Sequence, residues 1–78
     1  MINQEDVLKS LALAIDDSNF NLNSTVENTE NWDSLGLLAI VSTLSKLTSG
    51  RSDNLPELLD VSTALDLINI LRENGLVE

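Results

Sequence analysis

The chain has 78 residues with no cysteine and no histidine, which excludes a disulfide framework, a cysteine- or histidine-ligated zinc site, and cysteine or histidine nucleophiles. Thirteen acidic residues against four basic ones give a formal net charge of −9, which repels phosphate backbones and anionic lipids, so neither a nucleic-acid nor a membrane partner is predicted. A hydrophobic content of 42% is too high for an acidic disordered tail, and no alternating β-branched run is present. We therefore expect one all-α domain over residues 1–78. With no visible leader sequence and no cysteine, a cytoplasmic location is expected.

The first helix is predicted from about Asn3 to Asp16. Asn3 can cap it, and Glu5 and Asp6 place negative charge in the first turn, where the helix dipole favours it. Its apolar stripe recurs at spacings of three and four residues and comprises Val7, Leu8, Leu11, Ala14 and Ile15.

A long polar loop is predicted from about Asp17 to Asp33. Oxygen-bearing side chains at alternate positions from Asp17 suggest a calcium loop, but Leu22 stands where an EF-hand needs glycine and Asn28 where it needs a bidentate glutamate. No metal site is therefore predicted. Three apolar residues interrupt the loop and indicate that it is held against the core: Phe20, Leu22 and Val26.

The second helix is predicted from Ser34 to about Thr48. Ser34 can serve as its N-cap, and Gly50 can supply the left-handed residue after its end. The stripe that faces the core is expected to be Leu37, Ile40, Val41, Leu44 and Leu47.

A second face of this helix is not explained by core packing. Leu35, Leu38 and Ala39 point away from the stripe at about 100° per residue, and Ser42 and Ser45 lie beside them. Two interpretations remain open. Either the preceding loop folds back over Leu38, or this face is a docking surface next to Ser34.

The remainder contains a turn at residues 51–54, a short helix over Leu55–Asp60 with Pro56 in its first turn, and a last helix. Thr63, with Asp66 three residues later, resembles a capping box, and Gly75 fits the position after the helix end. The stripe of the last helix is Ala64, Leu67, Ile68 and Leu71.

Little catalytic chemistry is available. Clustered carboxylates could exchange protons, but acidic groups on a small helical domain usually form a solvated surface, and no glycine-rich phosphate loop is present. We therefore predict that the chain is not an enzyme. Ser34 is the notable residue, because a helix N-terminus stabilises a phosphate attached there.

The segment Trp32–Leu38, which reads Trp-Asp-Ser-Leu-Gly-Leu-Leu, resembles the attachment motif of the acyl carrier protein family. The resemblance extends over the whole chain, including the order of helices and the loop lengths. It implies a four-helix bundle of acyl-carrier-protein type, with three principal helices, a short third helix and a long loop after the first.

The resemblance also implies a function. A phosphopantetheinyl transferase would attach the phosphopantetheine arm of coenzyme A to Ser34, and the thiol of the arm would hold acyl, or possibly aminoacyl, groups as thioesters. Asp33 and Leu35 would be read by the transferase, with Leu38 and Trp32 as further recognition residues. Further partners would be acyl-loading and acyl-accepting enzymes of a fatty-acid, polyketide, nonribosomal peptide or related pathway, and the carrier would be a monomer.

One departure from the family concerns charge. The second helix of the family usually carries acidic residues, whereas Lys46 is the single charged residue of the helix here. The acidic residues lie before this helix and around the short one: Glu27, Glu30, Asp33, Asp53, Glu57 and Asp60. We expect a dedicated pathway rather than exchange with a standard fatty-acid synthase. The alternative is a carrier-like, non-catalytic interaction domain in which Ser34 stays unmodified.

Overall fold

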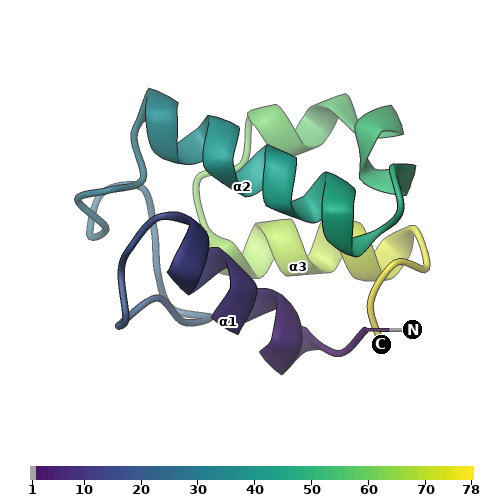
Figure 1. Ribbon diagram of the computed structural model, residues 1–78, viewed down its shortest axis with the longest axis horizontal. Coiled ribbons are helices and arrows are strands. Elements are labelled where there is room, and N and C mark those ends of the chain that lie inside the picture. Colours follow the sequence, from purple (N-terminus) through teal and green to yellow (C-terminus); the bar gives the residue numbers. More distant parts are fainter. Residues whose placement is uncertain (1) are drawn as a thin grey trace.

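The computed structural model describes residues 2–78 as a small, mostly helical domain (Figure 1). Its elements are α1 (Gln4–Ala14), α2 (Ser34–Leu47), the 3₁₀ helices η1 (Arg51–Asn54) and η2 (Pro56–Leu59), and α3 (Ala64–Glu73). No β-strand occurs in this range, and the helical class expected from the sequence is confirmed. The short helix expected over residues 55–60 is present as the single-turn 3₁₀ helix η2, and the turn expected at residues 51–54 is the 3₁₀ helix η1.

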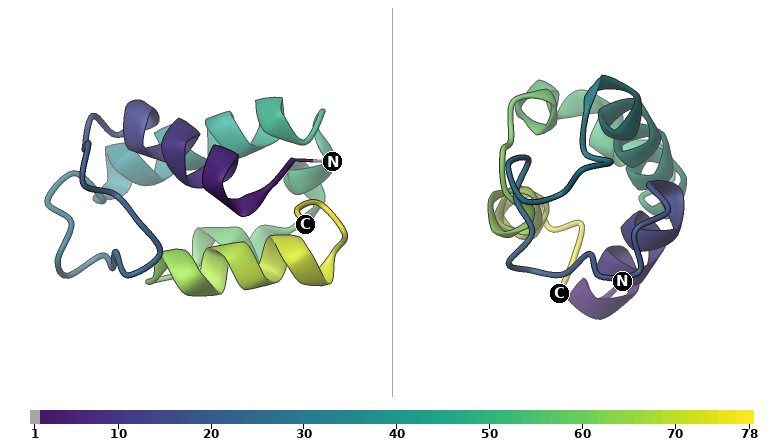
Figure 2. Two further views of the ribbon diagram at one scale, coloured as in Figure 1. Left: turned by 90° about the horizontal axis from the view of Figure 1, so that it is seen from below. Right: turned by 90° about the vertical axis from the view of Figure 1, so that its left-hand side faces the viewer.

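The three α-helices surround a common centre. In Figure 1, α2 and α3 run in the same direction and α1 runs in the opposite one. The long loop between α1 and α2 closes one end of the domain (Figures 1 and 2). At the other end the N–H of Glu78 donates to the carbonyl of Ile2 at 3.0 Å. Ser34, as the first residue of α2, therefore lies at the end that carries the loop.

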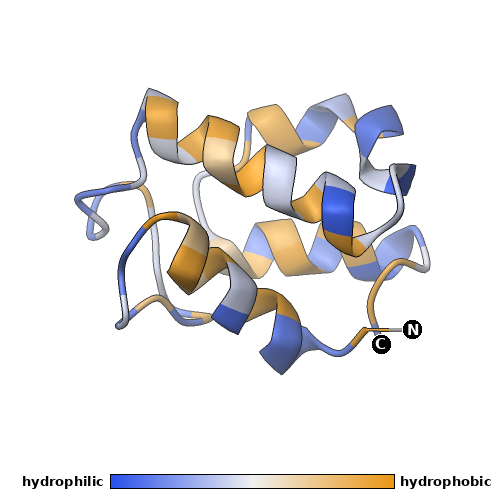
Figure 3. Ribbon diagram, in the orientation of Figure 1, coloured by the Kyte–Doolittle hydropathy of each residue, from blue (hydrophilic) through white to orange (hydrophobic). Residues whose placement is uncertain are grey.

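The core is aliphatic apart from two aromatic rings, and the predicted stripes supply most of it (Figure 3). All four stripe residues of α3 are buried, whereas α2 buries Ile40 and Leu44 fully and its other stripe residues only in part. The buried apolar residues are Val7, Leu11, Ile15, Phe20, Trp32, Ile40, Leu44, Leu58, Ala64, Leu67, Ile68, Leu71, Leu76 and Val77.

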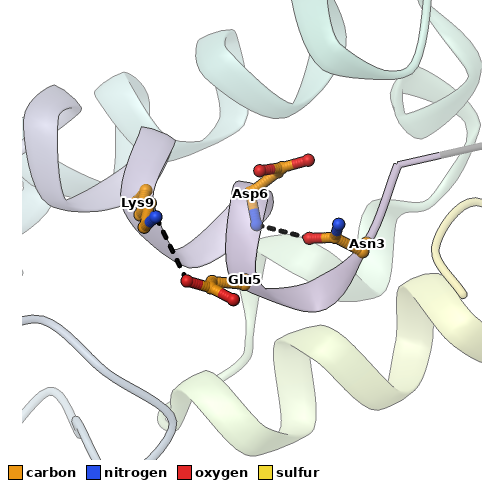
Figure 4. Close-up of polar contacts among 4 residues, drawn as sticks. All are labelled: Asn3, Glu5, Asp6 and Lys9. Carbon is orange, nitrogen blue, oxygen red and sulfur yellow. Dashed lines mark hydrogen bonds and ion pairs between the residues drawn. The ribbon is translucent and has the colours of Figure 1, made fainter.

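Two of the predicted helix starts are confirmed. Asn3 Oδ1 accepts a hydrogen bond from the backbone N–H of Asp6 at 2.8 Å (Figure 4). Thr63 Oγ1 accepts the corresponding bond from the N–H of Asp66 at 3.0 Å. Each cap satisfies an N–H that has no acceptor within its own helix. The Glu5–Lys9 ion pair in Figure 4 lies on the solvent-exposed side of α1 and adds little stability.

All three α-helices end in a Schellman motif, in which the residue after the C-cap is left-handed. These residues are Asp16 (φ 54°), Ser49 (φ 55°) and Gly75 (φ 72°). The prediction is confirmed for Gly75, whose neighbour Leu76 donates its N–H to the carbonyl of Leu71 at 2.9 Å. After α2, Gly50 is left-handed as predicted (φ 83°), but Ser49, one residue earlier, takes the position directly after the C-cap and is left-handed as well.

The long loop is held against the core by Phe20 and, in part, by Leu22, as predicted, whereas the side chain of Val26 is 41% exposed. Phe20 is buried, and its ring lies 5.7 Å from that of Trp32, centroid to centroid. The backbone N–H of Val26 donates to the carbonyl of Ser62 at 2.9 Å, and the N–H of Ala64 donates to the carbonyl of Ser24 at 2.9 Å. The loop thus joins the start of α3 to the segment that leads into α2.

Candidate functional site

The cap of α2 is Asp33, which corrects the assignment of Ser34 to that role. Asp33 has extended backbone angles (φ −113°, ψ −162°), and its Oδ1 accepts the N–H of Gly36 at 2.9 Å. Its carbonyl accepts the N–H of Leu37 at 2.8 Å and so begins the helical pattern. A carboxylate both caps the helix and complements the positive end of its dipole, so Asp33 is a suitable N-cap.

Ser34 is consequently the first helical residue, and it is exposed. Because Asp33 makes the cap, the Ser34 hydroxyl is not required for it. The N–H groups of Ser34 and Leu35 belong to the first turn, where a helix offers them no acceptor. They lie at the positive end of the α2 dipole, so an anion attached to Ser34 would be stabilised there.

Two residues that the sequence did not single out fix the approach to Ser34. The side-chain amide of Asn31 donates to the carbonyls of Ile15 and Asp16, at 2.9 and 3.3 Å, and so ties the segment to the end of α1. The carbonyl of Asn31 lies against Gly36, where a Cβ atom would overlap it. The available signal in the sequence for this close approach was a single glycine in the first turn of the helix.

Trp32 does not present its side chain to solvent. It is 3% exposed and packs on Phe20 within the core. Trp32, which the sequence suggested as a recognition residue, is therefore a core residue whose packing holds the backbone next to Asp33 and Ser34 in place. Direct contact with a partner through its ring would require the core to open.

An open groove of about 330 Å³ borders Ser34. Five apolar residues line it together with Asp33 and Ser34: Val26, Trp32, Leu37, Leu59 and Val61. We call this the serine groove. It brings together residues far apart in the sequence and offers an apolar surface beside the serine hydroxyl.

The outer face of α2 is open. Leu35 is 76% exposed and Leu38 is 63% exposed, so the interpretation in which the loop covers Leu38 was wrong. Ser42 is exposed on the same helix, but Ala39 is half-buried and packs against the core, which corrects its placement on this face, and Ser45 is half-buried. Ser34 thus has two apolar surfaces beside it, the serine groove and the exposed leucines.

The segments that precede and follow α2 carry mostly negative charge. Glu27, Glu30 and Asp33 are exposed before α2, and Asp53, Glu57 and Asp60 are exposed in and after the 3₁₀ helices. Within residues 2–78, no three acidic side chains gather closely enough to hold a metal ion. None of the helices in the same range is both long and apolar enough to cross a membrane.

No family model, curated protein or solved structure matches the chain.

Proposed function

We propose that the protein is a phosphopantetheine-dependent carrier that holds acyl, or possibly aminoacyl, groups and delivers them to partner enzymes. One observation carries the proposal: the Ser34 hydroxyl is exposed at the N-terminus of α2, is not needed as the cap, and borders an apolar groove. In this proposal the fold is an acyl-carrier-type four-helix bundle, with the 3₁₀ helices at the place of the short third helix.

The residues around Ser34 fit the attached group. Ser34 is exposed, and the first-turn N–H groups of α2 would stabilise the phosphodiester. The arm would supply a thiol, which this cysteine-free chain lacks. Asp33 would keep the helix start in place while a transferase acts on Ser34, and Leu35 and Leu38 would give that transferase and the acyl-handling enzymes an apolar contact. The chain itself would be no enzyme and would work as a cytoplasmic monomer.

A second candidate is a helical interaction domain in which Ser34 stays unmodified. The exposed Leu35 and Leu38 favour it, because a helix face that presents two large apolar side chains and no acid suits direct protein binding.

Mass spectrometry separates the two candidates. Protein incubated with coenzyme A and a phosphopantetheinyl transferase of broad specificity should gain one phosphopantetheinyl group. The gain should vanish in Ser34→Ala and persist in the control Ser42→Ala, which removes an exposed hydroxyl from the same helix. Ser34→Ala should fold normally because Asp33 caps α2. Absence of any gain across several transferases would refute the carrier and favour the interaction domain.

A further inference from the structure

Asn31 joins the two helices that lie on either side of the long loop. Its side-chain amide donates to the carbonyls of Ile15 and Asp16, which follow the last turn of α1, at 2.9 and 3.3 Å. The carbonyls at the end of a helix have no donor within it, and in residues 2–78 no backbone N–H outside the helices donates to either of these two. The Asn31 amide therefore caps α1 from the segment that leads into α2.

The backbone of Asn31 fixes the start of α2 at the same time. Its carbonyl lies so close to Gly36 that a Cβ atom there would overlap it. Only two residues separate Asn31 from Ser34, and both are held: Trp32 is buried in the core, and Asp33 accepts the N–H of Gly36. A displacement of Asn31 would therefore be passed on to Ser34. We call the two amide hydrogen bonds and the contact with Gly36 the Asn31 link.

The first turn of α2 has few other contacts that keep it in place. Ser34, Leu35 and Leu38 are all exposed, so core packing does not hold this part of the helix. The ends of helices fray, because their terminal N–H groups have no partner within the helix. The Asp33 cap and the Asn31 link are thus the contacts that oppose fraying at Ser34.

We propose that Asn31 is a positioning residue for the transfer of the phosphopantetheinyl group to Ser34. The reaction rests on the proposed function, whereas the order that Asn31 gives to the start of α2 follows from its contacts. In the transfer, the serine oxygen forms a bond to the phosphorus that carries the pantetheine. The bond from this phosphorus to the diphosphate bridge oxygen breaks, adenosine bisphosphate leaves, and the hydroxyl proton passes to a base of the transferase. Asn31 itself touches none of the reacting atoms and acts through the orientation of Ser34.

Hydrogen exchange of the whole protein tests the local part without a transferase. Asn31→Ala removes the amide, and Asn31→Asp keeps its shape but, when ionised, cannot donate. The N–H groups of Gly36 and Leu37, which both bond to Asp33, should exchange about tenfold faster in either variant, because two hydrogen bonds that oppose fraying are lost. Asn31 is exposed, so both variants should fold.

Modification kinetics, followed by mass with coenzyme A and a transferase of broad specificity, test the positioning role. In Asn31→Ala and Asn31→Asp, kcat should fall about three- to tenfold, because small displacements of a reacting group are costly. KM for the protein should change little, since the surface that the transferase meets is otherwise retained. A residue that contacted the transferase directly would alter KM instead.

Asn74→Ala is the matched control. The Asn74 side-chain amide donates to the carbonyl of Ile70 at 2.8 Å, at the end of α3 opposite to the long loop (Figure 1). The variant removes the same kind of bond far from Ser34, so its kcat should stay within about twofold of the parent.

Three results would each overturn the positioning role: unchanged exchange at Gly36 and Leu37, an equal loss of kcat in Asn74→Ala, or a change confined to KM. Failure of the carrier function looks different, because the parent protein itself would then gain no phosphopantetheinyl group, and a positioning role in that transfer would fall with it. A parent and an Asn31→Ala variant that are modified at the same rate would refute the positioning role and leave the carrier function intact.

Discussion

The close approach of Asn31 to Gly36 allows a prediction for Gly36→Ala. The sign of the change in the free energy of unfolding shows whether helix propensity or steric overlap with Asn31 dominates. Gly→Ala in a helix ordinarily stabilises it by about 1 kcal/mol, because alanine has the higher helix propensity. At Gly36 the new Cβ would overlap the Asn31 carbonyl oxygen and lie 3.0 Å from its carbonyl carbon. Both contacts are with backbone, so the segment that precedes Asp33 must move.

That movement lowers the free energy of unfolding. Overpacking of this kind costs about 1–3 kcal/mol. It would also strain the Asp33 cap, whose removal costs about 1 kcal/mol, and the two hydrogen bonds of the Asn31 amide. After the gain in propensity, we expect Gly36→Ala to lower the free energy of unfolding by about 1–2 kcal/mol, which for a domain of this size lowers Tm by roughly 4–16 °C.

Thermal and urea unfolding followed by far-ultraviolet circular dichroism would measure the change. Ser42→Ala serves as the control, because it introduces alanine at an exposed site of the same helix and should be neutral or slightly stabilising. If Gly36→Ala stabilised the protein as an ordinary helical glycine replacement does, the deduced contact with Asn31 would be wrong.

Three further predictions concern stability. Ser49→Gly should raise the free energy of unfolding by about 0.5–1 kcal/mol in urea titrations, because glycine relieves the cost of a left-handed serine; a destabilised variant would contradict the assigned helix end. Trp32→Ala should lower the free energy of unfolding by about 3–5 kcal/mol, because its side chain is buried, and Leu38→Ala by less than about 0.5 kcal/mol, because its side chain is exposed. Comparable losses of stability in the two variants would refute these placements. Added salt should raise Tm, because a formal net charge of −9 destabilises the compact state, and a salt-independent Tm in calorimetry would show that repulsion is unimportant.

Local patterns in the sequence were sufficient to predict the helices. The stripe of α3 is buried as expected, and Asn3 and Thr63 cap their helices, because periodicity and capping depend on residues close in sequence. The type of helix over residues 51–59 was harder to predict, since a segment of a single turn carries too little periodicity to distinguish a turn or a short α-helix from a 3₁₀ helix.

The candidate site was predictable only in part, because some of its features do not follow from local sequence patterns. Ser34 and the exposed leucines could be identified from the motif and the helix period. The burial of Trp32 and the fit of the Asn31 carbonyl on Gly36 depend on how the loop returns to the bundle, which has no periodic signal. The cap was ambiguous because aspartate and serine are both good caps and stand next to each other.

The position of the cap has a direct consequence for Ser34. A serine that capped α2 would commit its oxygen to an N–H of the first turn, and a group attached to that oxygen would disturb the helix start. With Asp33 as the cap, a substituent on Ser34 leaves the bond from Gly36 to Asp33 intact. Asp33→Ala should therefore destabilise the protein by about 1 kcal/mol, whereas Ser34→Ala should change its stability by less than about 0.5 kcal/mol. If Ser34→Ala destabilised the protein more than Asp33→Ala, Ser34 would be the N-cap and its hydroxyl would not be free to carry a substituent.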